Sequence, residues 1–109
     1  MSKDYFRRGA CPIFATAFLF KFQGRMIIYE NSKFTHVAVK VGKYVYDAFG
    51  QFAMNEYEEV LTNYYGAETR EVGRGIENMP VPPDDDAAWD DAYEILKDFP
   101  EKYGLQLRA

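Results

Sequence analysis

The chain of 109 residues has one cysteine, one histidine and one tryptophan. A single cysteine cannot form an internal disulfide, which excludes the disulfide-rich secreted scaffolds. No apolar run approaches the roughly 20 residues that span a bilayer. The longest run, residues 13–20, ends at Lys21. We therefore expect a cytoplasmic protein that does not bind a membrane.

Metal and nucleic-acid sites also lack support in the sequence. Zinc sites draw on paired Cys and His ligands, and the single Cys11 and single His36 cannot supply such pairs. Residues 1–43 carry 8 Lys/Arg against 2 Asp/Glu, but these cations form no dense block of the kind that binds nucleic acid. We expect no metal, no cofactor and no nucleic-acid partner.

The composition is typical of one folded domain, which we place over residues 1–109. Hydrophobic residues make up 48% of the chain and aromatic residues 17%, enough to form a single core. The negative charge lies in the second half, where the acidic stretch 84–98 contains Asp84, Asp85, Asp86, Asp90 and Asp91. This stretch fits the start of a helix, and it could also bind a protein partner.

The apolar pattern predicts an α+β fold with a central buried helix. That helix begins near Cys11, has Pro12 in its first turn, and presents almost no polar face through Phe22. Two further helices are expected, over residues 55–65 and from Asp84 to Pro100. Asn55 and Glu58 resemble a capping box at the start of the first of these.

The strands form a small, largely antiparallel sheet. Val37, Val39 and Val41 alternate with smaller or polar residues, as in a half-buried strand. Gly42-Lys43 predicts a two-residue hairpin turn before a second strand over 44–48. Two more strands are expected over 25–30 and 68–72, and a loop rich in Gly and Pro over 73–83.

The hairpin register brings a histidine and a carboxylate to one face. With Gly42-Lys43 as the turn, His36 lies opposite Phe49 and Asp47 lies opposite Ala38. His36 and Asp47 are then diagonal neighbours, with Cβ atoms about 7 Å apart. A slip of one residue would put them on opposite faces.

Cys11 completes a possible catalytic triad. A thiol at a helix N-terminus has its pKa lowered by the unpaired N–H groups and the helix dipole. His36 would act as the base, and Asp47 would orient the imidazole. The backbone N–H of Cys11 could bind an oxyanion, with Tyr5 or Gln51 as a tentative second donor because Pro12 lacks an N–H.

The same residues resemble a known superfamily. Gly9-x-Cys11-x-x-Phe14-Ala15 is similar to the signature of transglutaminase-like members of the papain-like cysteine hydrolases. Arg8-Gly9-Ala10-Cys11 and Val45 to Gly50 also resemble segments of arylamine N-acetyltransferases. The match covers residues 7–50 and implies a papain-like or transglutaminase-like core with Cys11, His36 and Asp47 as its triad.

Two functions remain open, and we favour the enzyme. One is a small cysteine hydrolase (thiol protease) or acyltransferase that acts on a peptide, protein or small amide, ester or thioester through an acyl-Cys11 intermediate. The alternative is a non-catalytic binding or inhibitor protein, such as a phage or mobile-element accessory factor, that uses the acidic helix face. A lone cysteine is more often a small buried hydrophobe. The joint placement of Cys11, His36 and Asp47 argues for the enzyme.

Overall fold

The computed structural model describes residues 3–7, 9–73 and 84–107. A short 3-10 helix, η1 (Lys3–Arg7), precedes helix α1 (Cys11–Lys21). The sheet and its helices then follow in the order β1 (Arg25–Glu30), β2 (Thr35–Val41), β3 (Tyr44–Asp47), β4 (Gly50–Ala53), α2 (Met54–Glu59), the π-helical turn η2 (Val60–Tyr64), β5 (Glu68–Gly73), α3 (Asp86–Leu96) and α4 (Phe99–Tyr103). Residues 74–83 of the expected loop lie outside the described residues.

The five strands form one antiparallel sheet in the order β4-β3-β2-β1-β5. The predicted hairpin register is confirmed, because Val39 pairs with Tyr46 and Val41 with Tyr44. The pairing of β2 with β3 stops at Val39 and Tyr46. Beyond that point β3 turns back into β4, with Asp47 opposite Gly50. Strand β4 was not predicted, and its turn leaves the start of β2 without a β3 neighbour.

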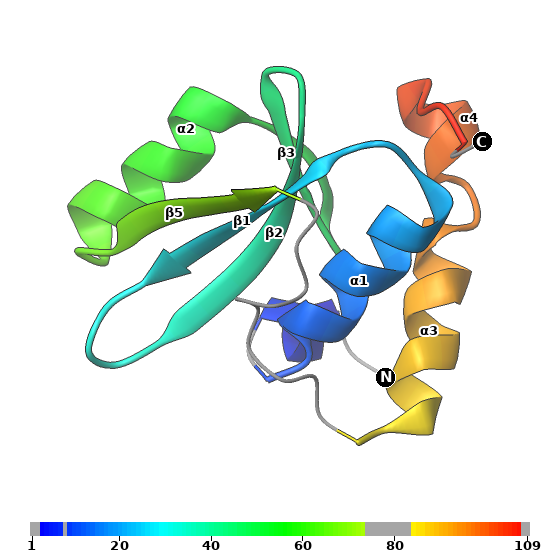
Figure 1. Ribbon diagram of the computed structural model, residues 1–109, viewed down its shortest axis with the longest axis horizontal. Helices are drawn as coiled ribbons and strands as arrows, with labels where there is room; N and C mark the ends of the chain where they lie inside the picture. Colours follow the sequence, from blue (N-terminus) through cyan, green and yellow to red (C-terminus); the bar gives the residue numbers. More distant parts are fainter. Residues whose placement is uncertain (1–2, 8, 74–83, 108–109) are drawn as a thin grey trace.

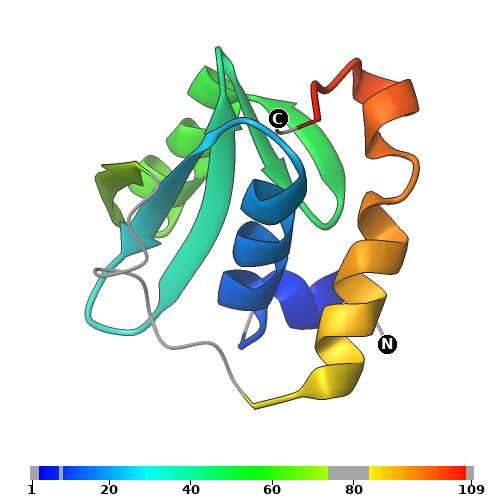
Figure 2. The same cartoon turned by 45° about the vertical axis from the view of Figure 1, so that its right-hand side comes forward.

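The elements stack in layers, with α1 in the centre (Figures 1 and 2). Helix α1 lies between the sheet and helices α3 and α4, while α2 covers the opposite face of the sheet. Every residue of α1 from Cys11 to Leu19 is buried, as expected for a helix with almost no polar face. Phe14, Phe18 and Phe22 share one core with Val37 and Val39, so α1 packs on the face of the hairpin that carries these valines.

Phe18 is the centre of an aromatic cluster in this core. Its ring centroid lies 5.0 Å from that of Phe22, 5.3 Å from that of Tyr46 and 6.5 Å from that of Phe99 on α4. Offset and edge-to-face contacts of this kind add to the free energy of burying the rings. Through these ring contacts helix α1 packs against the sheet on one side and against α4 on the other.

A smaller core lies on the other face of the sheet, under α2. Its buried residues are Ile27, Tyr29, Ala38, Val45 and Ala67, and Tyr57 and Leu61 pack against them. Since side chains alternate along β2, Ala38 belongs to this face and Val37 and Val39 to the face of α1. The sheet is therefore covered on both sides.

The helices differ from the prediction in three ways. In the described residues three α-helices follow α1 instead of two, because the last predicted helix is divided at Lys97 and Asp98 into α3 and α4. The helix expected to begin at Asp84 begins at Asp86, capped by the Asp85 side chain, which accepts from Ala88 N–H. The capping box of Asn55 and Glu58 is absent, since α2 begins at Met54 without a side-chain cap.

No helix in the described part of the chain is both long enough and apolar enough to cross a membrane.

Candidate functional site

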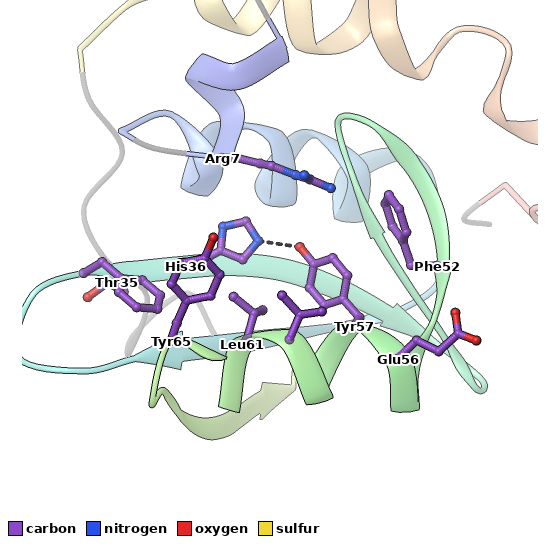
Figure 3. Close-up of a pocket in the computed structure, with 10 residues that line it drawn as sticks. Arg7, Thr35, His36, Phe52, Glu56, Tyr57, Leu61 and Tyr65 are labelled. Carbon is purple, nitrogen blue, oxygen red and sulfur yellow. Dashed lines mark hydrogen bonds between the residues drawn. The ribbon is translucent and has the colours of Figure 1, made fainter. Parts of the chain in front are cut away.

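A pocket of about 920 Å³ opens on the α2 side of the sheet, where β2 begins. Its walls are mainly aromatic and aliphatic; the Arg7 side chain and the Tyr57 hydroxyl point toward the His36 ring, while the Glu56 carboxylate lies apart from them (Figure 3). The residues that line it are Arg7, Phe34, Thr35, His36, Phe52, Glu56, Tyr57, Val60, Leu61 and Tyr65. An apolar pocket with a few convergent polar groups is the usual form of a small-molecule site.

His36 and Asp47 are linked through a third residue, Tyr57. The Tyr57 hydroxyl lies 2.6 Å from His36 Nε2 and donates to Asp47 Oδ2 at 2.8 Å. Both His36 and Asp47 are buried, at 5% and 1% exposure. The hairpin register predicted the two side chains as diagonal neighbours on one face. In the structure they share that face, but a hydroxyl stands between them.

Asp47 also holds Arg7 and the turn that follows β3. Arg7 Nε donates to Asp47 Oδ2 at 2.8 Å, and Phe49 N–H donates to Oδ1 at 2.8 Å. The Arg7 guanidinium lies over the Phe49 ring, 4.1 Å from its centroid, and 5.4 Å from that of Phe52. A buried carboxylate with three donors, one of them cationic, is well compensated for its loss of water.

Cys11 lies at the first turn of α1, against the start of β2. Its sulfur accepts a hydrogen bond from Val37 N–H at 3.4 Å and lies 3.9 Å from the carbonyl oxygen of Thr35. These two backbone groups flank His36 on either side. The thiol is 2% exposed and does not line the pocket, whereas Thr35 and His36 do. The fold therefore brings Cys11 next to the His36 main chain, on the side where β3 has turned away.

Burial shifts the pKa values of Cys11 and His36 in the directions opposite to those that would form a thiolate and an imidazolium. It raises the pKa of the Cys11 thiol, while the Val37 N–H opposes that shift. It lowers the pKa of His36, against the attraction of Asp47, and Arg7 lowers it further. A backbone hydrogen bond from the ring to Arg7 raises it again. In both groups burial thus favours the uncharged form, the thiol of Cys11 and the neutral imidazole of His36.

The two candidate oxyanion donors, Tyr5 and Gln51, make hydrogen bonds elsewhere. The Tyr5 hydroxyl donates to Asp85 Oδ2 at 3.1 Å, which joins η1 to the start of α3. Gln51 Nε2 donates to the Tyr46 hydroxyl at 2.8 Å. Neither residue lines the pocket. An oxyanion at Cys11 would therefore depend on backbone donors of the first turn.

Two polar residues of the site, Arg7 and Tyr57, were not singled out from the sequence. Tyr57 falls inside the helix expected over residues 55–65, and a hydroxyl at such a position gives no sign of the partner it will reach. Arg7 had a weak signal, since it directly precedes the segment that resembles the acetyltransferases. Their roles depend on which elements pack together, which a single sequence does not show.

The described residues contain no group of three or more His, Cys, Asp or Glu side chains that could hold a metal ion. Comparisons with protein-family models, curated proteins and solved structures found no match for the chain.

Proposed function

We propose that the protein is a small cysteine hydrolase or acyltransferase with a papain-like core, in which Cys11 is the nucleophile and His36 the base. The observation that carries this proposal is the position of the Cys11 sulfur, in contact with the main chain on both sides of His36. Support also comes from the hydrogen bonds that link the imidazole through the Tyr57 hydroxyl to Asp47. A nucleophile, a base and an orienting acid are the parts that such chemistry needs.

In the proposed reaction the thiol is activated as it attacks. His36 takes the proton of Cys11 while the sulfur bonds to the carbonyl carbon of an amide, ester or thioester. The protonated imidazole then donates to the leaving group as its bond to carbon breaks. Water or another acceptor releases the acyl group from Cys11 by the reverse sequence. Burial lowers the pKa of His36, which favours the neutral imidazole that a general base needs.

We further propose that an acyl or side-chain group of the substrate binds in the pocket beside His36. Phe34, Phe52, Leu61 and Tyr65 give it apolar walls, and His36 also lines it. A bulky aromatic or branched aliphatic group buried there gains about 25 cal/mol for each Å² removed from water. We therefore expect aromatic acyl groups to react faster than acetyl groups.

The proposal is tested by incubating the protein with acetyl and phenylacetyl thioesters and measuring its intact mass. Because Cys11 is the sole cysteine, any thioester adduct is located at once. Wild type and the exposed-site control Asp90→Asn should gain the acyl mass, faster with phenylacetyl, while Cys11→Ser and His36→Gln should not. No adduct and no turnover with either ester, or wild-type rates in His36→Gln, would reject the proposal. Full biological activity in Cys11→Ser would leave the binding-protein alternative.

A further inference from the structure

The Tyr57 hydroxyl lies between two buried hydrogen-bond partners, the imidazole of His36 and the carboxylate of Asp47. It rises from α2 toward the His36 ring, with Nε2 at 2.6 Å (Figure 3). Asp47 Oδ2 lies 2.8 Å away on its other side. The ring itself packs against Tyr29, with centroids 6.3 Å apart, and Tyr29 packs against Tyr57 at 5.7 Å. The hydroxyl therefore has little freedom to choose other partners.

Counting protons fixes the direction of these hydrogen bonds. A tyrosine hydroxyl has one proton to donate and can accept from a second group. Asp47 accepts from Arg7 Nε and from Phe49 N–H, so its carboxylate acts as an acceptor throughout. The Tyr57 proton therefore points to Asp47, as does the hydrogen bond itself. The hydroxyl oxygen must then accept from His36, which requires a proton on Nε2.

A proton on Nε2 determines which nitrogen can act as the base. In a neutral imidazole one nitrogen is the donor and the other the acceptor. If Nε2 carries the proton, Nδ1 carries the free electron pair. In Figure 3 the second ring nitrogen points away from Tyr57. Nδ1 is thus the unprotonated nitrogen, and the Arg7 backbone can accept its hydrogen bond once it has taken up a proton.

We propose that Tyr57 is the positioning residue of the site: its hydroxyl transmits the orientation of Asp47 to His36 and keeps the imidazole in the Nε2–H form. Asp47 acts on the ring through this hydroxyl instead of by direct contact. The link to Cys11 rests on the proposed function, whereas the tautomer of His36 does not. The two ideas can therefore fail separately.

The test is the ¹⁵N NMR spectrum of protein labelled with ¹⁵N-histidine, recorded where the imidazole is neutral. The chain has one histidine, so the spectrum holds a single imidazole and needs no assignment. Couplings to the ring carbon-bound protons show which nitrogen is protonated. We expect Nε2–H in the wild type. A wild-type ring protonated at Nδ1 overturns the proposal without any variant.

The variant Tyr57→Phe removes the hydroxyl and keeps the ring. His36 Nε2–H then loses its acceptor, while an Nδ1–H can still donate to the Arg7 backbone. The population should therefore shift toward Nδ1–H, and acyl transfer should fall by at least about tenfold, because the wrong nitrogen is then free. The control Tyr44→Phe alters a tyrosine that packs against the core on the α1 face and should leave the spectrum unchanged.

The outcomes separate the two proposals. Nitrogen shifts of Tyr57→Phe equal to those of the wild type would refute the positioning role. The expected tautomer shift in a protein that never acylates would reject the enzyme and retain the hydrogen-bond chain. A shift of tautomer with undiminished acylation would show that Tyr57 sets the ring without serving catalysis, and would also refute the positioning role.

Discussion

Replacing Asp47 with alanine should destabilise the fold far more than the loss of a surface carboxylate. Asp47 is 1% exposed and accepts hydrogen bonds from Arg7, Phe49 and Tyr57, which belong to η1, the β3–β4 turn and α2. In Asp47→Ala all three donors lose a charged acceptor at once. A hydrogen bond to a charged group contributes about 1.5–3 kcal/mol.

The loss in free energy of unfolding is smaller than the sum for three such hydrogen bonds, because part of the site can bind water instead. The Arg7 side chain is 39% exposed and can recover water, so its ion pair is discounted. The Tyr57 hydroxyl keeps His36 as a partner. The Phe49 N–H and the proton of the Tyr57 hydroxyl, however, lose the acceptor that Asp47 provides. We expect Asp47→Ala to lower the free energy of unfolding by about 3 kcal/mol, and Asp47→Asn, which retains the shape and one acceptor, by about 1–2 kcal/mol.

Urea unfolding followed by fluorescence measures this loss. Trp89, the sole tryptophan, is half-buried on α3 and reports on the core. With a urea dependence of about 2 kcal/mol per molar, the midpoint of Asp47→Ala should fall by roughly 1.5 M. The control Asp90→Ala, at an exposed position of α3, should stay within about 0.5 kcal/mol of wild type. An Asp47→Ala protein within 1 kcal/mol of that control would refute the reasoning.

Three further predictions concern the histidine, the thiol and the core. Because burial lowers the pKa of His36 below its ordinary 6.5, the unfolded chain binds that proton more tightly. Stability should therefore fall as the pH drops from about 6.5 through the folded pKa, and less so in His36→Gln, as urea unfolding at pH 7.5 and 5.5 would show. Because burial raises the Cys11 pKa, iodoacetamide should label the native thiol at pH 7 more slowly than the unfolded chain, and faster as the pH rises; rapid labelling at pH 6 would show a thiolate already formed. Phe18→Ala should cost about 3–5 kcal/mol by thermal or urea unfolding, and a loss under 1 kcal/mol would contradict the central place of that ring.

The parts of the fold that follow local rules were predictable from the sequence. The valines of β2 give both the strand and its face, and Gly42-Lys43 fixes the register that pairs Val39 with Tyr46. The continuous apolar surface of α1 predicts a helix covered on several sides, and the structure covers it with the sheet and with α3. These features depend on neighbours within a few residues, so one sequence contains them.

What escaped prediction depends on contacts between distant segments. Strand β4 has four residues and no clear alternation, and it forms because β3 turns back at Asp47 and Gly50. The position of the Tyr57 hydroxyl depends on how α2 packs on β1, β2 and β3. The register put His36 and Asp47 on one face, but it assumed that β3 follows β2 to its start. Because β3 turns away before it reaches His36, the Tyr57 side chain lies between His36 and Asp47.

The central position of α1 has a consequence for how the chain folds as it is made. The strands β1 to β4 are joined by short turns and can pair with their neighbours in sequence as soon as they are synthesised. Helix α1 precedes them, but α3, which covers its outer side, comes more than 60 residues later. Until α3 has left the ribosome, one side of a helix rich in phenylalanine has nothing to pack against. A nascent chain that pauses between β5 and α3 would expose that surface, so this interval is where aggregation or chaperone binding should concentrate.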